Sequence, residues 1–449
     1  MKEEQTLQPG YKPALGKWIF LSIQHVFAMF SATVLVPILT GLPISVALFA
    51  SGVGTLIYIL CTKGKVPIYL GSSFAYIGYI CVAANVVKDE SGRIVSSGPY
   101  GAALTGLVAV GLIYCIIACI IKFFGTGWLR KLLPPVVIGP MIMVIGLGLA
   151  GSAISNTGMI EKNFDWRAVV VSLSTMLIIA LLALKAKGFF KVVPFLVGII
   201  GGFIIAEIFD RVPGNTNLVE NMKFIEVLKN PSEWFALPKF MILGWKEQDY
   251  GVISMTQVNF GAVLTVIPLA FATICEHIGD HQVLGSITGK NYIENPGLHR
   301  TLIGDGIATA FSGFIGGPAN TSYGENTSVV GMTKIGSVWV TGGAAVIAIL
   351  LSFCNLFTTL ISIIPASVMG GVCLILYGFI ASNGLKVLVD KKVDLSKTRN
   401  LIIISVMLIV GIGGAIIPFA NGAKITATAI SAVLGVVLNA ILPKDKTEA

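Results

Sequence analysis

Three acidic residues lie inside apolar stretches of the sequence. They are Glu276, Asp280 and Glu325, and no Lys or Arg stands at the centre of such a stretch to pair with them. A charge at the centre of a bilayer costs about 2.5–3.5 kcal/mol even on a lenient insertion scale. Acids in such places normally face a cavity, a partner or a proton path. The alternative is that they are neutral acids hydrogen-bonded to neighbouring helices.

Glu325 lies in a segment, 320–326, that favours a break in a helix. Its sequence is Asn-Thr-Ser-Tyr-Gly-Glu-Asn, and Gly324 permits unusual backbone angles. A half-helix that starts here would present free N–H groups and a positive dipole end. The segment 71–74, Gly-Ser-Ser-Phe, would do the same in the first half of the chain. The other interpretation of these small residues is close packing between helices.

These groups together suit a neutral planar lactam such as a nucleobase. Carboxylates accept from ring N–H groups, backbone N–H groups donate to ring carbonyls, and the aromatic ring of Phe74 or Tyr323 can stack on a flat ligand. An inorganic anion fits poorly, because Glu276 and Glu325 would repel it.

A competing hypothesis comes from His277 and His281, which stand four residues apart. With Asp280 between them they resemble an H-x-x-E-H zinc-protease signature in which Asp replaces Glu. No remote third ligand is evident, because the other histidines are His25 and His299, and the seven cysteines show no metal spacing. The sequence therefore disfavours a zinc enzyme and predicts no metal and no cofactor. For His25, a hydrogen-bonded core histidine and a functional group are equally open.

The composition identifies the elements that must position these residues. Of 449 residues, 55% are apolar and 12% are charged, with a mean hydropathy of +0.86. Soluble domains usually carry about 25% charge, so a soluble enzyme, a disordered protein and a nucleic-acid-binding domain are excluded. A bilayer core requires roughly 20 apolar residues per helix. We therefore expect an all-α polytopic membrane protein, whose net charge of +9 reflects basic cytoplasmic loops.

Fourteen apolar runs can form these spans. They lie near residues 18–41, 45–62, 66–85, 99–121, 134–157, 167–184, 189–209, 258–281, 301–317, 318–332, 336–353, 356–380, 400–418 and 423–442. The third and tenth runs are short and rich in Gly, Ser, Thr and Asn, so neither is expected to be one continuous helix. An even number of spans with both termini in the cytoplasm places most of the 31 basic residues inside. No cleaved signal peptide is expected.

Three fragments of the first half recur in the same order in the second half. Segments 24–27, 71–76 and 132–139 resemble segments 276–279, 320–325 and 363–370. This order indicates two halves of seven spans. An odd number of spans per half forces opposite orientations, and in such inverted repeats the substrate site lies at the midplane between broken helices.

These residues resemble the nucleobase–ascorbate transporter family, also called nucleobase:cation symporter 2, and within it the bacterial uracil permease branch. The similarity covers nearly the whole chain and is strongest in segments 22–37, 69–75, 276–279, 295–300 and 320–326. It implies fourteen transmembrane segments in a 7+7 inverted repeat, short strands and half-helices in spans 3 and 10, and a homodimer.

The resemblance also implies a division into domains. A cytoplasmic N-terminus (1–17) and C-terminus (443–449) would flank a core domain, a gate domain and an extracellular loop. The core domain would comprise 18–125 (spans 1–4) and 258–354 (spans 8–11), the gate domain 126–210 (spans 5–7) and 355–442 (spans 12–14), and the loop 211–257. We expect this loop to pack at the membrane interface rather than to form a separate domain.

The implied function is proton-coupled import of uracil across the bacterial plasma (inner) membrane by an elevator-type movement of the core against the gate. The implied partners are uracil, protons and the lipid bilayer, with no nucleic acid. Six residues match the family's substrate-binding motifs. Glu276 and Glu325 would bond the ring nitrogens, backbone groups of Phe74, Tyr323 and Gly324 would meet the ring carbonyls, and Ala32 would line the pocket.

Two departures from the family pattern matter. A member of the branch has a histidine linked to proton coupling where this chain has Asp280, so the coupling role falls to Asp280, His281, Glu276 or Glu325. The family signature [Q/E/P]-N-x-G-x4-T-[R/K/G] starts at Glu325 with Ser328 in place of its glycine, which is then not available for helix packing.

Two alternative transport functions stay open. A purine (xanthine or urate) permease of the same family is the second hypothesis, although Glu rather than Gln at position 325 favours uracil. An anion exchanger of the same inverted-repeat fold is a distant third. Such an exchanger is expected to have a cationic residue at the half-helix site. It also often has a C-terminal cytoplasmic domain, whereas in this sequence a short polar segment follows Leu442.

Overall fold

The computed structural model describes residues 6–88, 94–187, 190, 193–211, 218–219, 222–251, 253–418 and 424–443. The terminal residues 1–5 and 444–449, which we expect in the cytoplasm, lie outside these ranges. Helices dominate the fold, and in the described residues seven of them are long and apolar enough to cross a membrane. They are α2 (Leu15–Thr40), α3 (Ile44–Cys61), α5 (Gly101–Phe124), α7 with α8 (Pro135–Gly148 and Ala150–Thr157), α9 (Trp166–Lys185), α13 (Gly261–Thr288) and α18 (Ala366–Asp390).

Shorter helices account for the other apolar runs. They are α4 (Ile77–Ala83), α11 (Pro194–Asp210), α14 (Leu298–Phe314), α15 (Gly324–Thr333), α16 (Val338–Ser352), α17 (Asn355–Ser362), α19 (Thr398–Ile412) and α20 (Ala427–Ile441). Two further helices, α6 (Gly127–Leu132) and α12 (Met222–Lys229), lie outside the predicted runs. The count of fourteen spans stays a prediction.

Local sequence explains where several of these helices begin and end. Pro135 and Pro194 stand at the first positions of α7 and α11, where a missing N–H costs no helical hydrogen bond. Gly41 and Gly289 end α2 and α13 with φ of 78° and 69°, a left-handed conformation that glycine adopts without strain. Asp165 caps α9 by accepting from the Arg167 N–H at 3.0 Å.

Two predicted boundaries differ from the structure. The run 356–380 is two helices, α17 and α18, because Pro365 stands between them as the N-cap of α18. The run 258–281 continues as helix to Thr288, so Asp280 and His281 lie inside α13 rather than near its end. Polar residues extend the helix beyond the apolar run, which hydropathy alone does not register.

Short strands occupy the two runs that we expected to be broken. Strand β1 (Leu70–Ser72) pairs antiparallel with β7 (Asn320–Ser322), and Gly71 lies opposite Thr321. After β1 the chain forms a 3-10 turn, η1 (Phe74–Tyr76), and then α4, whereas after β7 it enters α15. Each half of the chain therefore contributes one strand followed by a helix, and the two strands join the halves.

Hydroxyl groups of neighbouring helices satisfy the outer edges of this two-stranded sheet. On α3, Ser51 Oγ donates to the Leu70 carbonyl at 2.9 Å, and Thr55 Oγ1 accepts from the Leu70 N–H at 2.9 Å. On α14, Thr309 Oγ1 donates to the Asn320 carbonyl at 3.1 Å. Backbone groups in a membrane interior need such partners, so these hydroxyls allow strands at membrane depth.

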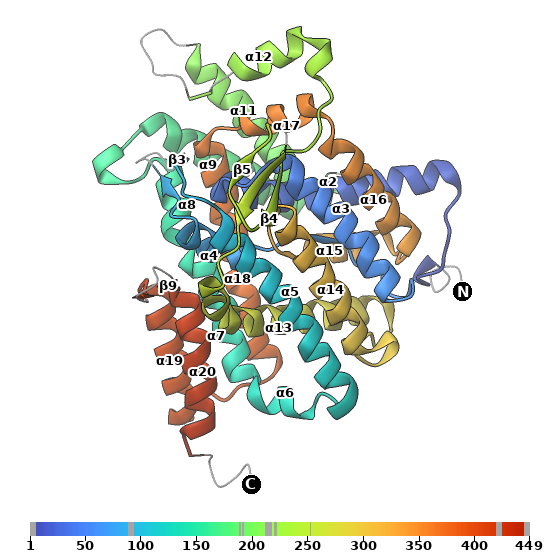
Figure 1. Ribbon diagram of the computed structural model, residues 1–449, viewed down its shortest axis with the longest axis vertical. Coiled ribbons are helices and arrows are strands. Elements are labelled where there is room, and N and C mark those ends of the chain that lie inside the picture. Colours follow the sequence, from blue (N-terminus) through green and yellow to red (C-terminus); the bar gives the residue numbers. More distant parts are fainter. Residues whose placement is uncertain are drawn as a thin grey trace.

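The helices pack in two groups, and each group has glycines at its closest contacts. In the first group α5 crosses α14, where a Cβ added to Gly111 would lie 2.3 Å from the Gly306 carbonyl. In the second group α7 crosses α18, where a Cβ on Gly384 would lie 2.5 Å from the Gly139 carbonyl. Such small-residue contacts drive helix association in membranes. Figure 1 shows α5 and α14 side by side near the centre and α19 and α20 at one edge.

The segment between α11 and α13 packs on the helices instead of standing apart. It contains α12 and a three-stranded sheet of β4 (Phe240–Gly244), β5 (Gln248–Asp249) and β6 (Ile253–Gln257). The Met241 N–H donates to the Ile315 carbonyl at 3.1 Å, and the Ala236 N–H donates to the Phe353 carbonyl at 3.0 Å. In Figure 1 α12 lies at the end of the molecule opposite α6.

Candidate functional site

Tyr323 joins the ends of the two strands to α2. Its hydroxyl donates to the Ser72 carbonyl at 2.9 Å and accepts from Thr33 Oγ1 at 3.2 Å. Ser72 Oγ in turn donates to the Thr33 carbonyl at 3.1 Å. The Tyr323 ring lies against Gly71, where an added Cβ would come within 2.3 Å of it. The Tyr323 ring therefore packs within the frame of the strands, whereas these contacts do not involve Phe74, the other aromatic candidate.

The N-terminus of α15 is open. A Cβ built on Gly324 would meet no atom within 4 Å, and Gly324 is exposed. Tyr323 is the N-cap and its side chain makes no capping hydrogen bond, so Tyr323 leaves the N–H group of Gly324 uncapped at this open position. Glu325 lies in this first turn and is half-buried. A carbonyl group could therefore approach the helix end directly.

Three carboxyl groups gather beside this helix end. Glu276 and Asp280 come from α13, which packs against α15, and both are half-buried. The carboxyl groups of Glu276, Asp280 and Glu325 lie close enough to interact electrostatically. Asp280 Oδ2 accepts from Ser322 Oγ at 2.6 Å. Glu276 Oε2 is buried and has no hydrogen-bond partner within the described chain, so it is available to a ligand N–H.

The first half of the chain contributes uncharged groups to the same region. Phe74 is half-buried and packs edge-on against Tyr377 of α18, with 6.5 Å between ring centroids. Tyr76 Oη hydrogen-bonds Thr273 Oγ1 of α13 at 2.7 Å, one turn before Glu276. Ser73 Oγ is buried with no partner among the residues that the structure describes. This side thus offers an aromatic face and a hydroxyl.

His25 and Ala32 of α2 are both buried. The side-chain amide of Asn326 donates to the His25 carbonyl at 2.9 Å and lies 3.0 Å from His25 Nδ1. His25 is thus a hydrogen-bonded histidine that positions α15. Ala32 is 1% exposed and belongs to the apolar cluster that contains Tyr323. Ser328, which replaces the signature glycine, is exposed and donates to the Gly324 carbonyl at 2.9 Å, so close packing does not require glycine there.

An acid–histidine pair that the sequence did not predict lies next to these carboxyls. Asp305 lies within α14, is 1% exposed, and its Oδ2 is 2.8 Å from His277 Nδ1. His281 Nδ1 hydrogen-bonds the His277 carbonyl at 2.6 Å, and its Nε2 hydrogen-bonds the Tyr58 hydroxyl. Each of these two histidines thus has a protein partner at one or both ring nitrogens, and in the described residues no cluster could hold a metal ion. The Gly-Asp-Gly sequence around Asp305 was the available signal.

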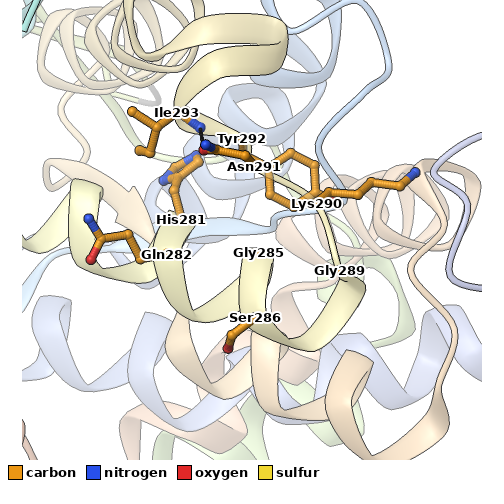
Figure 2. Close-up of a pocket in the computed structure, with 9 residues that line it drawn as sticks. All are labelled: His281, Gln282, Gly285, Ser286, Gly289, Lys290, Asn291, Tyr292 and Ile293. Carbon is orange, nitrogen blue, oxygen red and sulfur yellow. Dashed lines mark hydrogen bonds between the residues drawn. The ribbon is translucent and has the colours of Figure 1, made fainter. Parts of the chain in front are cut away.

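A cavity of about 380 Å³ lies beyond the acids, at the C-terminal end of α13. Its lining includes His281, Ser286, Lys290 and Tyr292, but none of the three carboxyl groups. Figure 2 shows His281 directed toward the segment that carries Asn291 and Tyr292, while Lys290 extends away. The cavity therefore touches the candidate site only through His281 and is not the place where α15 opens.

Comparison with known proteins assigns the family. The sequence model of the permease family that includes xanthine and uracil permeases matches residues 16–419. Uracil permeases from Bacillus caldolyticus and Bacillus subtilis (strain 168) are 45% and 43% identical to the chain over 436 and 442 residues. Those alignments cover 96% and 97% of this chain and 93% and 95% of the relatives. The uracil permease of Escherichia coli (strain K12) is 36% identical, covering 96% of this chain and 92% of the relative.

Solved structures with the same fold are more distant in sequence. The transmembrane domain of the cyanobacterial bicarbonate transporter BicA gives a TM-score of 0.63 at 15% identity, covering 95% of this chain and 99% of that one. The murine anion transporter Slc26a9 in its inward-facing state gives 0.65 at 11% identity, covering 96% and 69%. At these identities the likeness shows the fold alone.

The apolar helices, the shared fold and the relatives agree on a multi-pass membrane transporter, and the zinc-enzyme hypothesis is wrong. With a match across residues 16–419 and relatives at 36–45% identity over nearly its whole length, the chain belongs to the nucleobase–ascorbate transporter family of permeases.

Proposed function

We propose that this protein is a proton-coupled uracil symporter that imports uracil across the bacterial plasma membrane. The observation that carries the proposal is the identity of 36–45% to uracil permeases over nearly the full chain. The site supports it, because Glu276 Oε2, a buried oxygen without a partner in the described chain, comes from a helix that packs against α15, and the N-cap side chain of α15 makes no capping hydrogen bond. A nucleobase has the ring N–H groups and carbonyls that such groups bind.

Uracil would bind between the two strand–helix units. Glu276 Oε2 and the Glu325 carboxylate accept from the ring N–H groups, and backbone N–H groups at Gly324 and Phe74 donate to the ring carbonyls. The Phe74 ring covers one face of the base. Charge-assisted hydrogen bonds to a carboxylate are about twice as strong as neutral ones. The two glutamates therefore contribute most to affinity.

Proton coupling follows from the three neighbouring carboxyl groups. Like charges close together in a region of low dielectric disfavour full ionisation, so one proton shared among them lowers the electrostatic energy. Asp280 is the coupling candidate that we favour, because its carboxyl accepts a hydrogen bond of 2.6 Å from Ser322 Oγ at the end of β7. A proton bound there would connect α13 to the strand that leads into α15.

The architecture that we propose around this site is the core and gate of the family. Residues 18–125 and 258–354 form the core and residues 126–210 and 355–442 the gate, in fourteen spans arranged as a 7+7 inverted repeat. The two helix groups with their separate glycine contacts support this division. The core would move as an elevator against the gate within a homodimer, with both termini in the cytoplasm.

Uptake of labelled uracil into bacteria that lack their own uracil permease tests the function. We expect saturable uptake that is faster at acidic than at neutral pH, that a protonophore reduces, and that unlabelled xanthine leaves unchanged. Competition by xanthine would favour the purine permease instead. Uracil uptake whose rate depends neither on pH nor on the protonophore would contradict proton coupling, but uracil would remain the substrate.

A further inference from the structure

A second cavity, of about 190 Å³, lies away from the acids, between the end of α2 and the junction of α17 and α18. Ile38 and Leu39 of α2 line one side, and Ile363 and Met369 line the other. Ile94 and Leu218 also line it, and they come from the segments between spans 3 and 4 and between spans 7 and 8, which an N-terminus in the cytoplasm places outside. The cavity therefore lies at the outer end, between the two helix groups.

Asn156 at the end of α8 is the polar residue that distinguishes this cavity. It lines the cavity, is 4% exposed, and its Oδ1 has no hydrogen-bond partner among the described residues. Ser362, which also lines the cavity, already donates its hydroxyl to the Thr359 carbonyl at 2.8 Å. Native proteins rarely leave a buried amide oxygen without a partner. The free acceptor in an aliphatic surround therefore points to a ligand with an N–H group.

One apolar cluster contacts both this cavity and the candidate site. Leu39 and Met369 belong both to the cavity lining and to a buried cluster that includes Val372 and Tyr377. Phe74 packs against this same cluster. A solute that moved along this cluster from the cavity to Phe74 would pass these side chains, so the cavity can hold a solute before it reaches the candidate site.

We propose that this cavity is an outer access subsite for one small neutral heterocycle with a ring N–H, which is uracil if the proposed function holds. The aliphatic side chains cover the faces of the ring, and Asn156 Oδ1 accepts from the ring N–H. Its volume is below the range of about 300–1,000 Å³ that drug-sized ligands occupy, as suits a single ring. The inference rests on the proposed function and adds a binding step before the carboxyl groups.

Initial rates of labelled uracil uptake test the subsite in two variants. Asn156→Leu removes the acceptor at similar size, and Ala366→Leu fills the cavity while keeping Asn156. For both we expect kcat/KM to fall about fivefold, the loss of one neutral hydrogen bond, with the maximal rate within twofold of the wild type. Ser155→Ala, on the same helix but outside the cavity lining, is the control and should leave both parameters unchanged.

The outcomes separate this inference from the proposed function. Wild-type protein in the membrane without uracil uptake contradicts the proposed function, and the subsite for uracil falls with it. Wild-type uptake with unchanged kcat/KM in Ala366→Leu overturns the subsite alone, even where Asn156→Leu fails to reach the membrane. A fall in the maximal rate and in thermal stability, with KM unchanged, assigns Asn156 a structural role and also overturns the subsite.

Discussion

The unit formed by β1, η1 and α4 and the unit formed by β7 and α15 have similar backbones but different charges. In each unit a three-residue strand leads into a short helix, and hydroxyls of a neighbouring helix satisfy the outer edge of the strand. The first unit contributes Ser73 and Phe74, which are uncharged. The second contributes Glu325 and the contact of Ser322 with Asp280.

The difference in charge between the two units separates two roles, the backbone frame of the site and the groups that bind ligand and proton. Strand pairing and edge hydroxyls occur on both sides, because backbone groups at membrane depth must be satisfied wherever a strand forms. Carboxyl groups occur on one side only, because a second set facing them would add repulsion within a region of low dielectric. We therefore propose that the backbone of both units builds the site and that the charges of the second unit determine which ligand and which proton it binds.

Removal of the charge at Glu325 should have the largest effect. Glu325→Gln keeps the size of the side chain but replaces a charge-assisted hydrogen bond and the charge that balances the coupled proton. We expect uracil uptake to fall by at least about 100-fold, from a loss of roughly 3 kcal/mol. Ser328→Ala, an exposed residue of the same helix, is the control and should retain uptake. Normal proton-coupled uptake in Glu325→Gln would falsify the assignment of this half as the charged one.

Asp280→Asn should have an intermediate effect that depends on pH. If a protonated Asp280 is needed for the loaded site to cross, wild-type uptake increases as the pH falls and the carboxyl binds its proton. Asn resembles the protonated acid at every pH, so we expect the variant to lose this acid stimulation. Because Asn cannot release a proton before the empty site returns, we also expect transport to be about tenfold slower. Asp249→Asn, an exposed acid on β5, serves as the control. Retained acid stimulation in Asp280→Asn would assign the coupling to another carboxyl.

Gly71→Ala tests the packing of β1, in the uncharged unit, against the Tyr323 ring. The added methyl group would lie 2.3 Å from the Tyr323 ring, so the ring or the strand must shift. Overpacking of this kind costs about 1–3 kcal/mol, and we expect a lower melting temperature of the purified protein together with weaker uracil binding. Gly78→Ala, where a Cβ meets nothing within 4 Å, should leave both unchanged. A wild-type melting temperature for Gly71→Ala would show that Tyr323 does not lie on β1.

Removal of the hydroxyls at the strand edges should lower thermal stability least, and by similar amounts in the two units. Thr55→Val and Thr309→Val each remove hydrogen bonds to a strand at nearly constant side-chain volume, which costs about 1 kcal/mol per bond. Thr55 contacts both the N–H and the carbonyl of Leu70, so its replacement should be slightly more destabilising. Thermal unfolding of the purified variants measures this. A large loss in one variant only would contradict the likeness of the two units.

Much of this organisation could be predicted from local sequence. The apolar runs determine which segments cross a membrane, since hydropathy acts residue by residue, and the isolated acids Glu276, Asp280 and Glu325 are visible for the same reason. The Gly, Ser and Asn content of runs 66–85 and 318–332 predicts that their helices break, and the structure has a strand in each.

The contacts that build the site were decided by the tertiary structure. Ser72 and Tyr323 meet although they are 251 residues apart, and only strand register brings Ser322 to Asp280. The pairing of Asp305 with His277 was invisible because it depends on how α14 crosses α13. Composition sets the cost of placing each residue in the membrane, whereas packing between distant helices determines which of those residues become partners.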